Sequence, residues 1–96
     1  MKTQDETRLI LSSIRSLLGS ITPALRSVSV EFKDNTILWQ SIFDQNATRD
    51  DFELMNEATS ELIADFPNAG LKETIKKIPY PKKIKHLSNL IYLRHE

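Results

Sequence analysis

The 96-residue sequence contains no cysteine and only two glycines and two histidines. Without cysteine there is no disulfide, no thiolate metal site and no cysteine nucleophile, and this composition suits a reducing compartment. Two glycines are too few for a glycine-rich loop that binds phosphate. The histidines, His86 and His95, lie in an expected loop and at the chain end, where solvated side chains are usual. We therefore expect no enzyme, no cofactor and no metal site.

Long apolar runs are missing as well. No stretch approaches the roughly 20 apolar residues that a membrane-spanning helix needs. The N-terminal segment carries Asp5, Glu6 and Arg15 among its apolar residues, so we do not expect a signal peptide. Hydrophobic residues make up 40% of the chain and charged residues 27%, which is typical of a globular protein. We expect a cytoplasmic protein with a single domain over residues 1–96.

Net charge is zero overall, yet the charges are unevenly distributed along the chain. Residues 1–43 carry five basic and four acidic side chains. Residues 44–65 carry seven acidic side chains against Arg49 alone, whereas residues 66–96 carry seven basic side chains against two acidic ones. Such a chain can pair its own halves, or it can present one half to a charged partner.

The first half of the chain predicts a helix and a hairpin. Apolar spacing predicts a helix over residues 5–18, and Gly19 is well placed to end it. Its apolar stripe, of the kind that packs on a core, comprises Leu9, Ile10, Ile14, Leu17 and Leu18. Alternating residues 26–32 and the β-rich residues 36–43 predict two strands, and the short polar turn between them predicts a hairpin.

The second half predicts a helix followed by two more strands. Thr48 and Asp51 have the spacing of a capping box before the helix. The side chains that we expect this helix to bury are Phe52, Met55, Ala58 or Thr59, Leu62 and Phe66. Residues 71–78 predict a strand whose lysines favour an exposed or edge position. The prolines of residues 79–89 indicate a loop, and residues 90–94 predict the last strand.

The expected fold is therefore α+β, with element order α-β-β-α-β-β. Two hairpins would form one four-stranded antiparallel sheet, and both helices would pack on one face of that sheet.

The second helix has an unusual charge pattern, because acidic residues recur every four positions without an intervening lysine. This acidic ladder consists of Glu53, Glu57, Glu61 and Asp65. Like charges at this spacing are neighbours on a helix and repel by about 0.2–0.5 kcal/mol per pair. The acids at the start of the helix, Asp50, Asp51 and Glu53, suit the helix dipole, but Glu57, Glu61 and Asp65 do not. Two explanations are open: the acids pair with the C-terminal lysines, or they serve a partner with a basic cleft.

A lysine-rich segment offers an alternative function. Residues 72–85 carry six lysines around Tyr80, a composition that could bind phosphates, so the chain could be a small nucleic-acid-binding accessory protein. A solvated edge strand and loop explain the same lysines, and the acidic residues elsewhere would repel a phosphate backbone.

Several segments together resemble a known family. They are LLGSITPALRSVSVEF (17–32), ELIADFP (61–67), PYPK (79–82) and YLRHE (92–96). They are similar to small bacterial immunity proteins of contact-dependent growth inhibition and related polymorphic toxin systems. One departure is Arg94-His95, where the family usually has two basic residues before the final glutamate.

The resemblance implies a non-enzymatic inhibitor that binds and neutralises the C-terminal domain of one cognate toxin. Such toxins are commonly nucleases, often acting on tRNA, and their RNA-binding clefts are normally basic. The implied toxin-binding residues are Asp50, Glu53, Glu57 and Glu61, with Asp65 at the rim and Tyr80 as an aromatic anchor. Trp39 lies in a β-rich run and is expected in the core. The free protein is expected to be a monomer or a weak dimer.

Overall fold

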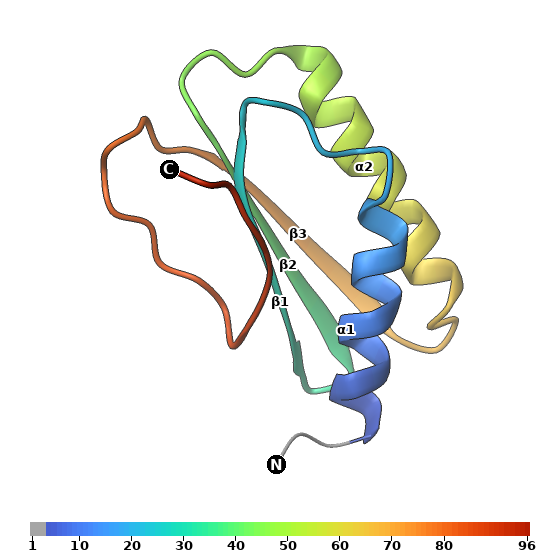
Figure 1. The fold of residues 1–96 in the computed structure, drawn as a ribbon. Coiled ribbons are helices and arrows are strands. Elements are labelled where there is room, and N and C mark those ends of the chain that lie inside the picture. Colours follow the sequence, from blue (N-terminus) through green and yellow to red (C-terminus); the bar gives the residue numbers. More distant parts are fainter. Residues whose placement is uncertain (1–3) are drawn as a thin grey trace.

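The computed structural model describes residues 4–96 (Figure 1). Its elements are α1 (Gln4–Leu17), β1 (Leu25–Lys33), β2 (Thr36–Phe43), α2 (Arg49–Ala64), β3 (Gly70–Lys77) and β4 (Asn89–Leu93). The predicted α-β-β-α-β-β order is confirmed, and each strand begins and ends within one residue of its expected position.

The sheet is mixed, so the prediction of a wholly antiparallel sheet made of two hairpins is wrong. The strand order is β3-β2-β1-β4; β1 is antiparallel to β2 and β4, whereas β2 and β3 are parallel. The reason is α2, which carries the chain back along the sheet before β3 begins. Strands joined through such a crossover run in the same direction. Consequently β3 and β4 form no hairpin and lie at opposite edges.

Both helices cover one face of the sheet, as predicted (Figure 1). On α2, the predicted core residues Met55, Ala58, Thr59 and Leu62 are buried and Phe52 is half-buried; Phe66, just after the helix, is buried as well. Two edge-to-face ring contacts fix the two ends of this helix to the sheet. Phe52 meets Phe43 with ring centroids 5.1 Å apart, and Phe66 meets Phe32 at 5.6 Å. We call this side of the sheet the helix face.

The opposite side, here called the loop face, is crossed by residues 78–88. Gln40 Nε2 donates to the Lys85 carbonyl over 2.7 Å. The Leu87 N–H donates to Ser29 Oγ over 3.0 Å. These bonds hold the predicted loop against β1 and β2, and they guide the chain from the β3 edge to the β4 edge of the sheet.

The orientation of α1 differs in part from the one that the apolar spacing of residues 9–18 predicts. Leu9 and Leu17 are buried, but Ile14 is 45% and Leu18 71% exposed. Apolar side chains surround much of this helix, so apolar spacing alone does not define its buried side. Contacts with the end of α2 decide the orientation instead: Arg15 forms an ion pair with Asp65, described below with the acidic ladder.

The two helices should therefore respond differently to truncation of a leucine. Leu62 is fully buried between α2 and the sheet, so Leu62→Ala should lower the free energy of unfolding by about 2–5 kcal/mol. Leu18→Ala, at an exposed position, should change it by no more than about 0.5 kcal/mol. Urea unfolding followed by the fluorescence of Trp39 measures both, and equal losses would contradict the orientation of α1.

Candidate functional site

The first turn of α2 is built by a capping box, as predicted. The Thr48 N–H donates to the Asp51 carboxylate over 2.7 Å. This bond holds the pKa of Asp51 below its usual range, because the carboxylate form accepts the hydrogen bond. Asp51 is thus committed to starting the helix, whereas Asp50 beside it is exposed.

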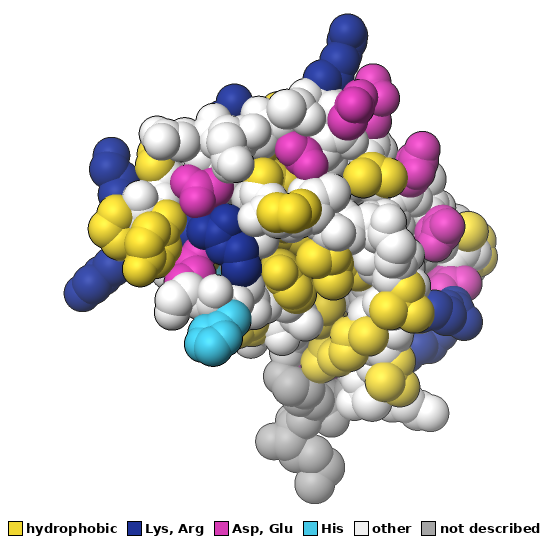
Figure 2. All heavy atoms as spheres, turned by 45° about the horizontal axis from the view of Figure 1, so that its top comes forward, with side chains coloured by type: hydrophobic (Ala, Val, Ile, Leu, Met, Phe, Trp, Pro, Cys, Tyr) yellow, Lys and Arg dark blue, Asp and Glu magenta, His cyan; other side chains and the backbone are white. Residues whose placement is uncertain are grey.

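Three acids of the ladder face solvent on α2. Glu53 lies 3.7 Å from the Arg49 guanidinium, but both side chains are largely exposed, so this pair contributes little. Glu57 and Glu61 are exposed, and within residues 4–96 no ion pair joins either of them to a basic side chain. Figure 2 shows acidic side chains in a column along one side of the molecule.

Asp65, the last acid of the ladder, has a different environment. Its carboxylate accepts a hydrogen bond from the Arg15 guanidinium, and its backbone carbonyl accepts one from Arg8. The Arg8 guanidinium also lies 4.5 Å from the centre of the Phe66 ring. Asp65 therefore joins α2 to α1, and its charge is neutralised within the protein.

The lysines of β3 do not reach the ladder. Side chains alternate along a strand, and Leu71 and Ile75 pack on the core, so Lys72 and Lys76 lie on the loop face. Lys77 lies on the helix face, but its ammonium contacts the Phe52 ring, 5.7 Å from the ring centre, and not the ladder. Among the described residues the ladder pairs only with arginines, so pairing with the C-terminal lysines does not account for it.

One residue of β3 that faces α2 is acidic. Glu73 accepts a weak hydrogen bond from Thr59 Oγ1 over 3.4 Å, and within residues 4–96 its second carboxylate oxygen is buried without a partner. Burial raises the pKa of Glu73, because the charged form is poorly solvated there. A partly buried carboxyl group therefore lies beneath α2.

Tyr80 lies in the 78–88 segment and not on α2. The Tyr80 N–H donates to Asp44 Oδ1 over 3.1 Å. Tyr80 is 54% exposed, and the centre of its ring lies 5.7 Å from the Arg26 guanidinium. Tyr80 is therefore beside the connection that leads into α2. Trp39 is fully buried, as expected.

A network of ion pairs surrounds that connection, and the sequence interpretation missed it. Arg26 donates two hydrogen bonds, of 2.7 and 2.8 Å, to the Glu96 carboxylate. Arg94 lies 2.9 Å from both Asp44 and Glu96. The signal was present in the quoted YLRHE ending, whose arginine and glutamate now have a structural role.

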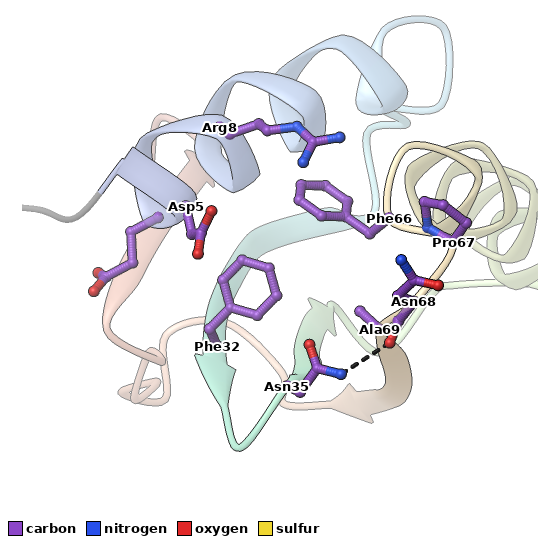
Figure 3. A pocket seen from close by; sticks show the side chains of 9 residues that line it. Asp5, Arg8, Phe32, Asn35, Phe66, Pro67, Asn68 and Ala69 are labelled. Atoms are coloured by element: carbon purple, nitrogen blue, oxygen red, sulfur yellow. Dashed lines mark hydrogen bonds between the residues drawn. The ribbon is translucent and has the colours of Figure 1, made fainter.

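A hollow lies at the C-terminal end of α2 (Figure 3). It measures about 410 Å³ and lies between the start of α1, the β1–β2 turn and the segment after α2. Figure 3 shows the Arg8 guanidinium above the Phe66 ring, with the Phe32 ring beside it. Within residues 4–96 no group of three or more His, Asp or Glu side chains is arranged to hold a metal ion.

A family model described as MafI2 immunity protein matches residues 6–96, nearly the whole chain. The chain belongs to the MafI2 immunity protein family. No curated protein matches it. Membership in this family implies that the protein binds and neutralises a cognate toxin, and immunity proteins are generally not enzymes. No helix within the described residues has the length and apolar character to cross a membrane.

In this MafI2 family member, four of the six expected toxin-binding residues share one side of α2. They are Asp50, Glu53, Glu57 and Glu61. Asp65 is occupied by Arg15, and Tyr80 belongs to the network at the start of α2. The available acidic surface of the immunity protein therefore runs along α2 from Asp50 to Glu61.

The ion-pair network predicts how the stability of the immunity protein depends on pH. Hydrogen bonds from Arg94 and from the Gln45 and Tyr80 N–H groups lower the pKa of Asp44 to about 2, and Arg26 lowers the pKa of Glu96. Both carboxyls are more acidic when folded, so their stabilisation is complete above about pH 5 and disappears as the pH falls toward 2.

Asp44→Asn should therefore be less stable than the wild type at pH 6, and the difference should shrink steadily between pH 4 and about pH 2. Urea unfolding at several pH values measures this difference. Glu73 has a shift of opposite sign, but it is present in both proteins and cancels in the comparison. A difference that does not change with pH would contradict the proposed role of the network.

Proposed function

We propose that this immunity protein neutralises a nuclease toxin by placing the exposed acids of α2 over the toxin's basic RNA-binding cleft. The observation that carries the proposal is the state of Glu57 and Glu61. Both are exposed and have no ion pair within residues 4–96, although the same chain carries lysines that lie on the opposite face. A protein that keeps this arrangement has surface charge available for a cationic partner.

The geometry of the helix suits such a cleft. Acids four residues apart lie about 6 Å apart along the helix axis, and each is turned by about 40° from the one before. The result is a row of negative charges on a rigid support. A cleft that binds RNA phosphates must present cations, so it would accept this row in place of its substrate. Complementary charge also speeds association, which favours capture of the toxin in the cytoplasm before it reaches RNA.

Reversing the two unpaired charges tests the proposal. Glu57→Lys together with Glu61→Lys should weaken binding of the toxin domain by about 100-fold or more, because cations would then face cations. Thermal stability should stay equal or rise, since the repulsion along the ladder is relieved. Calorimetric titration with an inactive form of the toxin's C-terminal domain, whose gene we expect directly upstream, measures the affinity.

The matched control reverses two charges on the loop face. Lys72→Glu together with Lys76→Glu should change the affinity by only a few-fold. If Lys72→Glu with Lys76→Glu loses toxin binding while Glu57→Lys with Glu61→Lys retains it, the acidic-helix mechanism is wrong. If the wild type binds generic RNA and Lys72→Glu with Lys76→Glu does not, the result would instead favour the nucleic-acid-binding alternative through residues 72–85.

A further inference from the structure

The outer side of α1 and the residue that follows it carry large apolar side chains that are exposed. Leu11 is 63%, Ile14 45% and Leu18 71% exposed. Spacings of three and four residues place these side chains on one side of the helix, and we call them the α1 stripe. Ile21, in the turn that follows, is 45% exposed as well.

The buried side of the same helix contains small polar residues. Ser13 is fully buried and Ser16 is 4% exposed beside the buried Leu9 and Leu17, and within residues 4–96 the Ser13 hydroxyl has no hydrogen-bond partner. A helix selected only for stability would have apolar residues at these two serine positions and polar residues at the exposed ones. Such a local departure from the binary pattern is expected where a surface has a function.

Contacts with α2 fix this orientation. The Arg15–Asp65 ion pair and the contact of Arg8 with the Phe66 ring lie on the side of α1 that faces α2. Turning the stripe inward would break both contacts and leave the Asp65 carboxylate without its cation. The stripe is therefore held on the surface.

The α1 stripe lies beside the acidic ladder. Each acid of the ladder is rotated further around α2 than the one before it. The last acid, Asp65, contacts α1 through its ion pair with Arg15. Figure 2 shows hydrophobic side chains gathered beside the column of acidic side chains. Together the two helices present one apolar strip with an acidic strip along its flank.

We propose that the α1 stripe is the apolar anchor of the same toxin contact, so that the toxin buries the stripe while its basic residues meet Glu57 and Glu61. This inference rests on the proposed function. Charge alone seldom gives tight binding, and interfaces depend on a few buried apolar anchors surrounded by polar residues. The toxin surface should therefore place apolar side chains next to lysines or arginines.

The charges beside the stripe favour a basic partner over a second copy of this chain. Arg8 and Arg15 are the two basic residues of α1, and both are already engaged with the end of α2. A second copy would present the same acidic ladder and no available arginine from this helix. Within the described residues of α1 no other cation is present, so the complementary surface should supply cations.

The test replaces the anchors without changing charge. Leu11→Gln together with Leu18→Gln should weaken binding of the inactive toxin domain by at least about 30-fold and leave the melting temperature unchanged or higher. Glutamine is a good helix former, so α1 should persist. The affinity that remains should keep its salt dependence, whereas the Glu57→Lys and Glu61→Lys variant should lose it.

The control is Leu90→Gln together with Leu93→Gln. These leucines are 45% and 53% exposed, and their pairing with Ser29 and Ser27 places them on the loop face. This variant should bind the toxin domain as the wild type does. If the Leu90→Gln and Leu93→Gln control unfolds, a comparison of Leu18→Gln alone with the Lys72→Glu and Lys76→Glu variant serves the same purpose.

The outcomes separate this inference from the proposed function. If Leu11→Gln with Leu18→Gln binds the toxin normally while Glu57→Lys with Glu61→Lys does not, the α1 stripe is not an anchor and the acidic mechanism stands. If neither of these two variants shows weaker binding, both proposals are wrong. If sedimentation shows that the wild type is a dimer that the leucine variant dissociates, a second copy covers the stripe and the inference is wrong.

Discussion

The packing of α2, which connects β2 to β3, on one face of the sheet is the constraint on which the rest of the structure depends. One side of this helix is occupied by the sheet, through Leu62 and the ring contacts at its two ends, so its acids must face outward. The same crossover makes β3 parallel to β2 and sets which side chains of β3 face the helix. Glu73 faces α2, while Lys72 and Lys76 lie on the loop face. A single packing arrangement thus separates the charges of a chain that is neutral overall.

This separation makes two surfaces of opposite character. The helix layer combines unpaired acids with the α1 stripe, and the loop face carries lysines along β3 and the 78–88 segment. The arginines, by contrast, hold the structure together. Arg15 joins the helices, whereas Arg26 and Arg94 secure the C-terminal residues beside the start of α2. This division follows from chemistry, because guanidinium groups form bidentate and stacked contacts that an ammonium group cannot form.

Much of the fold could be predicted from the sequence, because strand alternation, the Thr48–Asp51 capping box and the apolar side of α2 are local signals. The parallel pairing of β3 could not, since it depends on where α2 returns the chain. The buried side of α1 was predicted only in part: Leu9 and Leu17 are inside, but Ile14 and Leu18 are not. A helix with apolar residues around much of its circumference leaves the choice to tertiary contacts, here those of Arg8 and Arg15. The acidic candidate surface was visible in the spacing, but the partners of Asp65 and Tyr80 required the folded structure.

The outer side of the α1–α2 layer is the proposed toxin contact. Mapping of amide chemical shifts in the labelled immunity protein, titrated with the inactive toxin domain, tests this contact most directly. The largest changes should occur at Leu11, Leu18, Glu57 and Glu61. Changes concentrated in β4 and at the lysines of residues 82–85, with α1 and α2 unaffected, would contradict it.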